Sequence, residues 1–67
     1  MVLVTIKPLE LEKQTAMKGW SRKQLADSSG VSIATISQIM SGKACKVKTA
    51  VDIAKALETD FDTLVAQ

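Results

Sequence analysis

The chain has 67 residues, of which 46% are hydrophobic, and its formal net charge is +2. It is long enough for one small domain, and because no apolar run approaches about 18 residues, a membrane-spanning helix and a membrane partner are excluded. Histidine is absent, which excludes a Cys/His metal site and the commonest general base, so we expect no enzyme, no metal and no cofactor. The lone Cys45 cannot form an internal disulfide and indicates a reducing, cytoplasmic compartment.

Residues 1–7 are expected to form an N-terminal arm, followed by one folded domain over residues 8–67. Residues 2–6 read VLVTI, which is typical of a strand, and Pro8 either ends this extended run or begins the first helix. The arm is an ordered segment, a strand that pairs with a second copy, or a frayed end. Fraying is the default for a chain terminus.

A first helix is expected over residues 9–18, closed by Gly19. Its apolar positions are irregularly spaced, so the sequence does not define its buried face. Trp20 follows directly before the next helix start, where it would form a hydrophobic staple with Leu25. This position favours a core role for Trp20 over stacking on a nucleic-acid base.

Residues 21–42 predict two short helices joined by a tight turn. Ser21 and Gln24 form a capping box at the start of the first helix. Gly30 supplies the positive φ that ends this helix and turns the chain. Ser32 is a good N-cap for the second helix. A helix, a glycine turn and a second helix are the parts of a helix-turn-helix.

The second helix of this pair has one apolar face. Ile36 and Ile39 are three positions apart and are expected to be buried, with Met40 at the edge of the core. The positions left for its other faces are Ile33, Ala34, Thr35, Ser37 and Gln38.

The C-terminal part is expected to add two more helices. After Gly42, a basic connector (KACKVK) leads into a helix over residues 47–57 with helical apolar spacing. Asp60 is expected to cap a last short helix, which carries Phe61, Leu64 and Val65. Five helices with short connections predict a compact all-α domain.

Charge is unevenly distributed along the chain. Between residues 18 and 48, six basic residues accompany a single acidic one, Asp27, whereas the residues after 48 are mainly acidic. This pattern indicates one surface that faces an anion. The alternative is a surface whose charges are only solvated.

At this point the sequence resembles the Cro/CI-type (XRE-like) helix-turn-helix family, which includes phage repressors and Cro proteins. The resemblance covers about Leu9 to Leu64, and it is strongest in GWSRKQLADSSGVSIATISQIMSGK and in IAKALETDFDTL. It implies a five-helix, lambda-repressor-like domain with its helix-turn-helix at residues 21–42. In such a unit the second helix lies in the DNA major groove and the first crosses the backbone.

The resemblance also implies a set of DNA contacts. Backbone contacts are expected from Arg22, Lys23, Ser32, Ser41, Lys43, Lys46 and Lys48. Base contacts are expected from Ile33, Ala34, Thr35, Ser37 and Gln38. Gln38 is the best candidate for bidentate recognition of adenine, and the methyl groups of this helix suit thymine. Because the helix carries no charge that could clamp guanine, we expect readout weighted towards A·T pairs.

Four positions depart from the family pattern. Thr15 stands where many relatives carry an arginine, which puts the usual ion pair to the second helix of the motif in doubt. Cys45 and Lys46 replace the common helix-start residues, so the helix from residue 47 is expected to be poorly capped. Glu58 stands where glycine usually ends that helix, so this end is expected to be strained or to turn differently.

The function implied is that of a transcriptional regulator that binds double-stranded DNA sequence-specifically. It is expected to be a repressor that acts as a homodimer on a pseudo-palindromic operator, and DNA binding would associate it with the nucleoid. Phe61, Leu64 and Val65 are candidates for the dimer surface; the alternative is that they complete the core of one chain. A second possibility is an antitoxin or accessory module whose main partner is another protein, because fold does not determine function.

Overall fold

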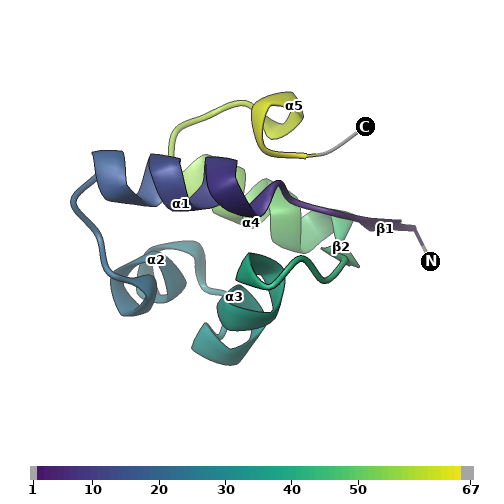
Figure 1. The fold of residues 1–67 in the computed structure, drawn as a ribbon, viewed down its shortest axis with the longest axis horizontal. Helices are drawn as coiled ribbons and strands as arrows, with labels where there is room; N and C mark the ends of the chain where they lie inside the picture. Colours follow the sequence, from purple (N-terminus) through teal and green to yellow (C-terminus); the bar gives the residue numbers. More distant parts are fainter. Residues whose placement is uncertain (1, 66–67) are drawn as a thin grey trace.

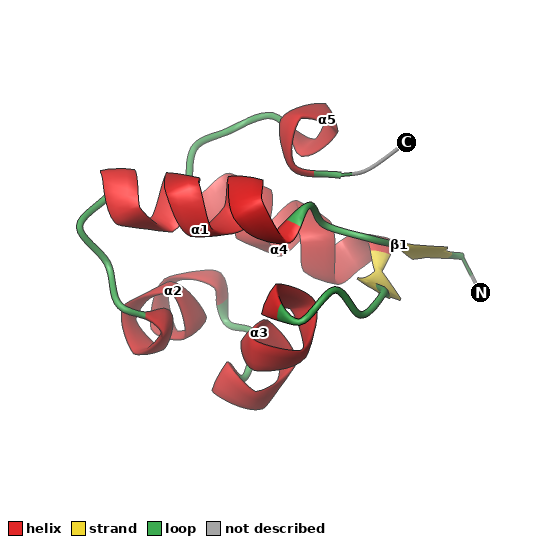
Figure 2. Ribbon diagram, viewed as in Figure 1, coloured by secondary structure: helices red, strands yellow, loops and turns green. Residues whose placement is uncertain are grey.

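The computed structural model describes residues 2–65, which form five helices and one pair of short strands. In chain order these are β1 (Leu3–Val4), α1 (Pro8–Met17), α2 (Arg22–Ser29), α3 (Ile33–Met40), β2 (Cys45–Lys46), α4 (Val47–Ala56) and α5 (Phe61–Leu64). Helices α1 and α4 lie across the middle of the domain, with α2 and α3 on one side and α5 on the other (Figure 1). The all-α prediction is confirmed, since the strands are two residues each (Figure 2).

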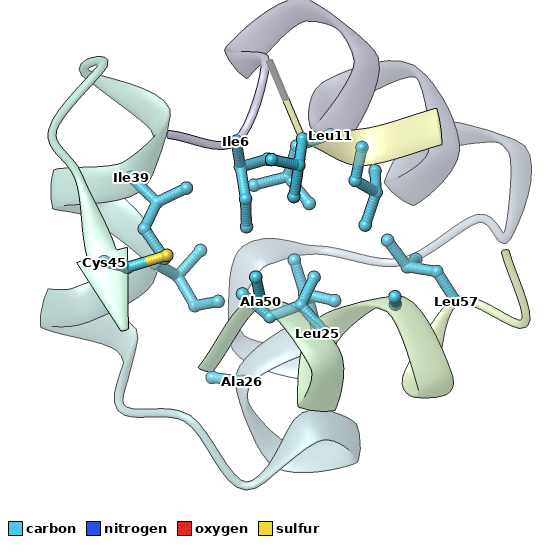
Figure 3. Packing of buried hydrophobic residues seen from close by; sticks show 13 residues of the cluster. Ile6, Leu11, Leu25, Ala26, Ile39, Cys45, Ala50 and Leu57 are labelled. Carbon is cyan, nitrogen blue, oxygen red and sulfur yellow. The ribbon is translucent and has the colours of Figure 1, made fainter. Parts of the chain in front are cut away.

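One hydrophobic core joins these elements (Figure 3). Helix α2 contacts α4, α3 packs on both α1 and α2, and α5 packs on α4. The largest fully buried side chains are Ile6, Leu11, Leu25, Ile36, Ile39, Ile53 and Leu64. Helices α1 and α4 therefore support the helix-turn-helix by packing on its core side.

Helix α1 buries a narrow stripe. Leu11 and Thr15, one turn apart, are buried, whereas Leu9 and Met17 are exposed. The buried Thr15 hydroxyl donates a hydrogen bond to the Leu11 carbonyl at 2.7 Å. The position that many relatives fill with arginine thus holds a small hydroxyl that is satisfied within its own helix, at low desolvation cost.

The caps predicted for residues 21–42 are confirmed. Ser21 Oγ accepts from the Gln24 N–H at 3.2 Å, and Gln24 Oε1 accepts from the Ser21 N–H at 2.7 Å. Gly30 has φ 73° and donates its N–H to the Ala26 carbonyl at 2.9 Å. A side chain at Gly30 would be strained in this left-handed conformation, so the glycine is what makes the turn possible.

The N-terminal arm is ordered within its own chain, so the default expectation of fraying is wrong for residues 2–7. Strand β1 pairs antiparallel with β2, with Leu3 opposite Lys46 and Val4 opposite Cys45. Ile6 is fully buried and forms an isolated bridge with Val65. Burial of one large apolar side chain and pairing on β2 outweigh the chain-end entropy that favours fraying.

The C-terminal apolar residues pack into the core of this chain, which is the alternative that the sequence left open beside a dimer surface. Leu64 and Val65 are 0% and 4% exposed, and Phe61 is partly buried against the same core. Asp60 is at the N-cap of α5, but its side chain makes no capping hydrogen bond. The alternative role in core completion is therefore the one that the burial supports.

The two ends of α4 behave as the sequence suggests. Its N-cap, Lys46, has no side-chain capping bond. At the other end Glu58 has φ 55°, its N–H donates to the Lys55 carbonyl, and the Thr59 N–H donates to the Ala54 carbonyl. This is the Schellman geometry that usually carries glycine. Among residues 2–65, Glu58 is the one non-glycine residue with positive φ, so the strain is real.

We expect Glu58→Gly to raise the melting temperature by roughly 2–6 °C, because glycine adopts this conformation without the Cβ penalty. Thermal melts followed by far-UV circular dichroism test this; a lower midpoint would contradict the strain.

Glu58→Gln is the matched control, because it keeps the strained backbone and removes the ion pair with Lys18, which measures 2.6 Å. The hydrogen bond and positive charge of Lys18 lower the pKa of Glu58. The pair therefore stabilises the fold above the ordinary glutamate pKa of about 4.3 and is lost as pH falls through the lowered value. The melting temperatures of wild type and Glu58→Gln should differ at pH 7 and converge in acid.

Candidate nucleic-acid interface

Helix α3 has one buried and one exposed face. Ile36 and Ile39 are 0% and 1% exposed, whereas Ile33 is 50% exposed. The side chains of Ala34, Ser37 and Gln38 are exposed as well. The expected division of this helix is confirmed, and methyl groups, a hydroxyl and a carboxamide remain accessible on its outer face.

The hydroxyls of Ser32 and Thr35 interact at the first turn of α3, and the Ser32 hydroxyl caps the helix. Ser32 Oγ accepts from the Thr35 N–H at 3.2 Å and lies 2.8 Å from Thr35 Oγ1. Thr35 is also partly buried. Its hydroxyl is therefore engaged inside the protein, which makes it a weaker candidate for base contact than Gln38, whose side chain has no hydrogen-bond partner among residues 2–65.

Replacing Ser32 by alanine is expected to lower the free energy of unfolding by about 0.5–2 kcal/mol, because the Thr35 N–H loses its cap. Urea denaturation gives the value. Ser28→Ala is the control: Ser28 is exposed in α2 and its side chain makes no hydrogen bond within the described chain. Equal effects at the two serines would contradict the capping role.

Four cations on the segments that flank α3 in the chain have no ion-pair partner in its described part. Arg22 and Lys23 begin α2, Lys43 follows α3, and Lys46 precedes α4; all are exposed, and none has a carboxylate within 4.0 Å among residues 2–65. At helix starts, cations oppose the helix dipole. The first turns of α2 and α4 hold such cations and no acidic residue. Helix stability therefore does not explain Arg22, Lys23 or Lys46, whereas Lys43 lies beyond the C-terminal end of α3, where a cation does not oppose the dipole.

Two other residues that are expected to contact the DNA backbone already interact within the protein. Ser41 Oγ donates to the Gln38 carbonyl at 2.7 Å. Lys48 Nζ lies 3.0 Å from Asp52 Oδ2. Sequence reasoning missed Asp52, although its spacing of four residues from Lys48 on a helix is a signal for such a pair.

An open groove follows the turn between α2 and α3. Its lining includes Lys23 and Ser32, which are expected to contact phosphates, and Ile33, which is expected to contact bases. It is lined by Lys23, Ala26, Asp27, Gly30, Val31, Ser32 and Ile33. The helix-turn-helix thus presents these residues as one continuous surface.

Cys45 lies on the inner side of β2, where its sulfur points into the core (Figure 3). Burial raises the pKa of the Cys45 thiol. The thiolate is thereby disfavoured at neutral pH, and with it the nucleophilic form.

Trp20 packs partly buried against the core, in agreement with its expected structural role. Lys18 Nζ lies 5.7 Å from the centre of its ring, within the range of a cation–π contact.

In residues 2–65 no helix is both long and apolar enough to span a bilayer.

Comparison with known proteins identifies the family of the domain. The HTH_3 helix-turn-helix family model matches residues 12–64. An HTH_3 family transcriptional regulator from Vibrio cholerae is 30% identical with a TM-score of 0.77, over 84% of this chain and 32% of that one. A hydroxyethylphosphonate dioxygenase is 21% identical with a TM-score of 0.83, over 94% of this chain and 14% of that one. No curated protein sequence matches.

The chain therefore spans less than a third of each of these two solved proteins, and the likeness to the dioxygenase concerns the fold alone. Because the HTH_3 model matches residues 12–64, which is most of the chain, and the caps and the turn of the motif are present, the chain belongs to the HTH_3 family of XRE-type helix-turn-helix proteins.

Proposed function

We propose that this chain is a sequence-specific regulator that binds double-stranded DNA through α3 and represses transcription by occupying promoter DNA. The observation that carries the proposal is the exposed, uncharged face of α3 together with exposed cations on the flanking segments that have no ion-pair partner among residues 2–65: Arg22, Lys23, Lys43 and Lys46. These cations suit phosphates, which set position and affinity, and the uncharged face suits base edges, which set sequence. No catalytic step is proposed.

The operator is expected to be weighted towards A·T pairs. Helix α3 carries no arginine or lysine for guanine, whereas Ile33 and Ala34 offer apolar contact to thymine methyl groups. Gln38 supplies both a donor and an acceptor to adenine. We further propose that two copies bind half-sites about one helical turn apart.

Selection of bound duplexes from a random pool tests the whole proposal. It yields the preferred site, its symmetry and its half-site spacing. Sedimentation of the protein with the selected duplex then gives the number of copies bound. A pool without enrichment, together with a stable complex with another protein on purification, would instead favour an antitoxin or accessory role.

Gln38→Ala is expected to weaken binding to the selected operator by about 1–3 kcal/mol and to relax the preference at one base pair. The residue is exposed and its side chain makes no contact that the fold needs, so the melting temperature should stay close to that of the wild type. Fluorescence anisotropy on the operator and on single-base variants measures both effects. Uniform weakening on every sequence would refute the base-reading role.

A further inference from the structure

Lys48 and Asp52 form an ion pair at the end of α4 that adjoins the proposed DNA surface. Lys48 Nζ and Asp52 Oδ2 are 3.0 Å apart, and the side chains are 85% and 33% exposed respectively. Lys46, two residues earlier, is exposed and has no ion-pair partner in the described chain. One of two neighbouring lysines is thus paired with a carboxylate and the other is not.

Helix stability does not account for this pair. Lys48 is in the first turn of α4, where the helix dipole disfavours a cation. The order of the pair, with lysine N-terminal to the acid, is also the less favourable one at a spacing of four residues. A lysine at this position is better explained by an anion outside the chain, which the proposed function supplies as DNA phosphate.

Resting on that function, we propose that Asp52 limits the affinity of the domain for DNA by competing with phosphate for Lys48. While the pair is closed, Lys48 contributes little net positive charge to the surface. To neutralise a phosphate, Lys48 has to exchange one anion for another, and the released carboxylate then repels the backbone. Lys43 and Lys46 carry no such penalty. The pair therefore reduces the number of cations that release counterions on binding.

The test compares Asp52→Asn with the wild type on the selected operator and on a random duplex, over a range of salt concentrations. Asparagine keeps the shape of the side chain and removes its charge. At low salt we expect Asp52→Asn to bind both duplexes about two- to fivefold more tightly, as expected for release of an exposed ion pair. The slope of log affinity against log salt should steepen by about 0.9, corresponding to one more phosphate contact.

Two controls separate this from a general charge effect. Glu58→Gln removes one negative charge from the ion pair with Lys18 and is expected to leave the slope unchanged. In a Lys48→Gln background Asp52→Asn removes only the repulsion between the carboxylate and the DNA backbone, so the salt slope should stay unchanged. A slope that steepens equally without Lys48, or unchanged binding by Asp52→Asn when the wild type binds normally, would overturn the inference alone. If neither the wild type nor Asp52→Asn binds any selected duplex, the proposed function is overturned as well.

Discussion

Ile36→Ala is expected to lower the free energy of unfolding by about 2–5 kcal/mol, because it removes a fully buried side chain and leaves a cavity where α3 meets α1 and α2. A domain of this length has a total stability of roughly 3–10 kcal/mol. The substitution therefore removes a large share of the stability. Urea denaturation, followed by the fluorescence of the single Trp20 and by far-UV circular dichroism, measures the loss.

Ile33→Ala is the matched control, since the same change is made three residues earlier on the same helix. Ile33 is half exposed, so little burial is lost, and alanine is the better helix former. Its denaturation midpoint should stay close to that of the wild type while its affinity for the operator falls. If the two isoleucine variants were equally stable, the assignment of the buried and exposed faces of α3 would be wrong.

The affinity for DNA is expected to fall steeply with salt. If the four unpaired cations Arg22, Lys23, Lys43 and Lys46 each neutralise one phosphate, the log–log slope is about −3.6, and raising salt from about 50 to 200 mM weakens binding roughly 150-fold. Anisotropy titrations at several salt concentrations measure the slope on the operator and on a random duplex.

Single glutamine substitutions assign the slope to residues. Replacing any one of these four cations should reduce the magnitude of the slope by about 0.9 on both duplexes, because phosphate contacts carry no sequence information. Lys13→Gln, on the exposed side of α1, should leave the slope unchanged. A flat salt response of the wild-type protein would argue against the backbone role of these four residues.

Much of the helix-turn-helix was predictable because its signals are local. Ser21 with Gln24, Gly30 and Ser32 act within one turn of where they stand, so residue type alone indicates the caps and the turn. The spacing of Ile36 and Ile39 defines a buried face, and Ile33 and Gln38 are then left outside it. The strained end of α4 was expected for a different reason, because Glu58 stands where the family pattern usually has glycine.

Contacts between distant segments were not predictable in this way. The β-prone arm had no visible partner in the sequence, because β2 is only two residues long and lies within a basic connector. Likewise Phe61, Leu64 and Val65 read equally well as core or as interface, since hydrophobicity shows that a side chain prefers burial but not what buries it.

For this protein, the sequence by itself determined the all-α class, the position of the motif and the division of α3 into a core face and an outer face. The tertiary structure was needed to show that β1 pairs with β2 and that Ile6 and Val65 lie together in the core, because these contacts join segments far apart in the sequence. Helical periodicity and capping are properties of neighbouring residues, whereas burial depends on how distant segments meet in space.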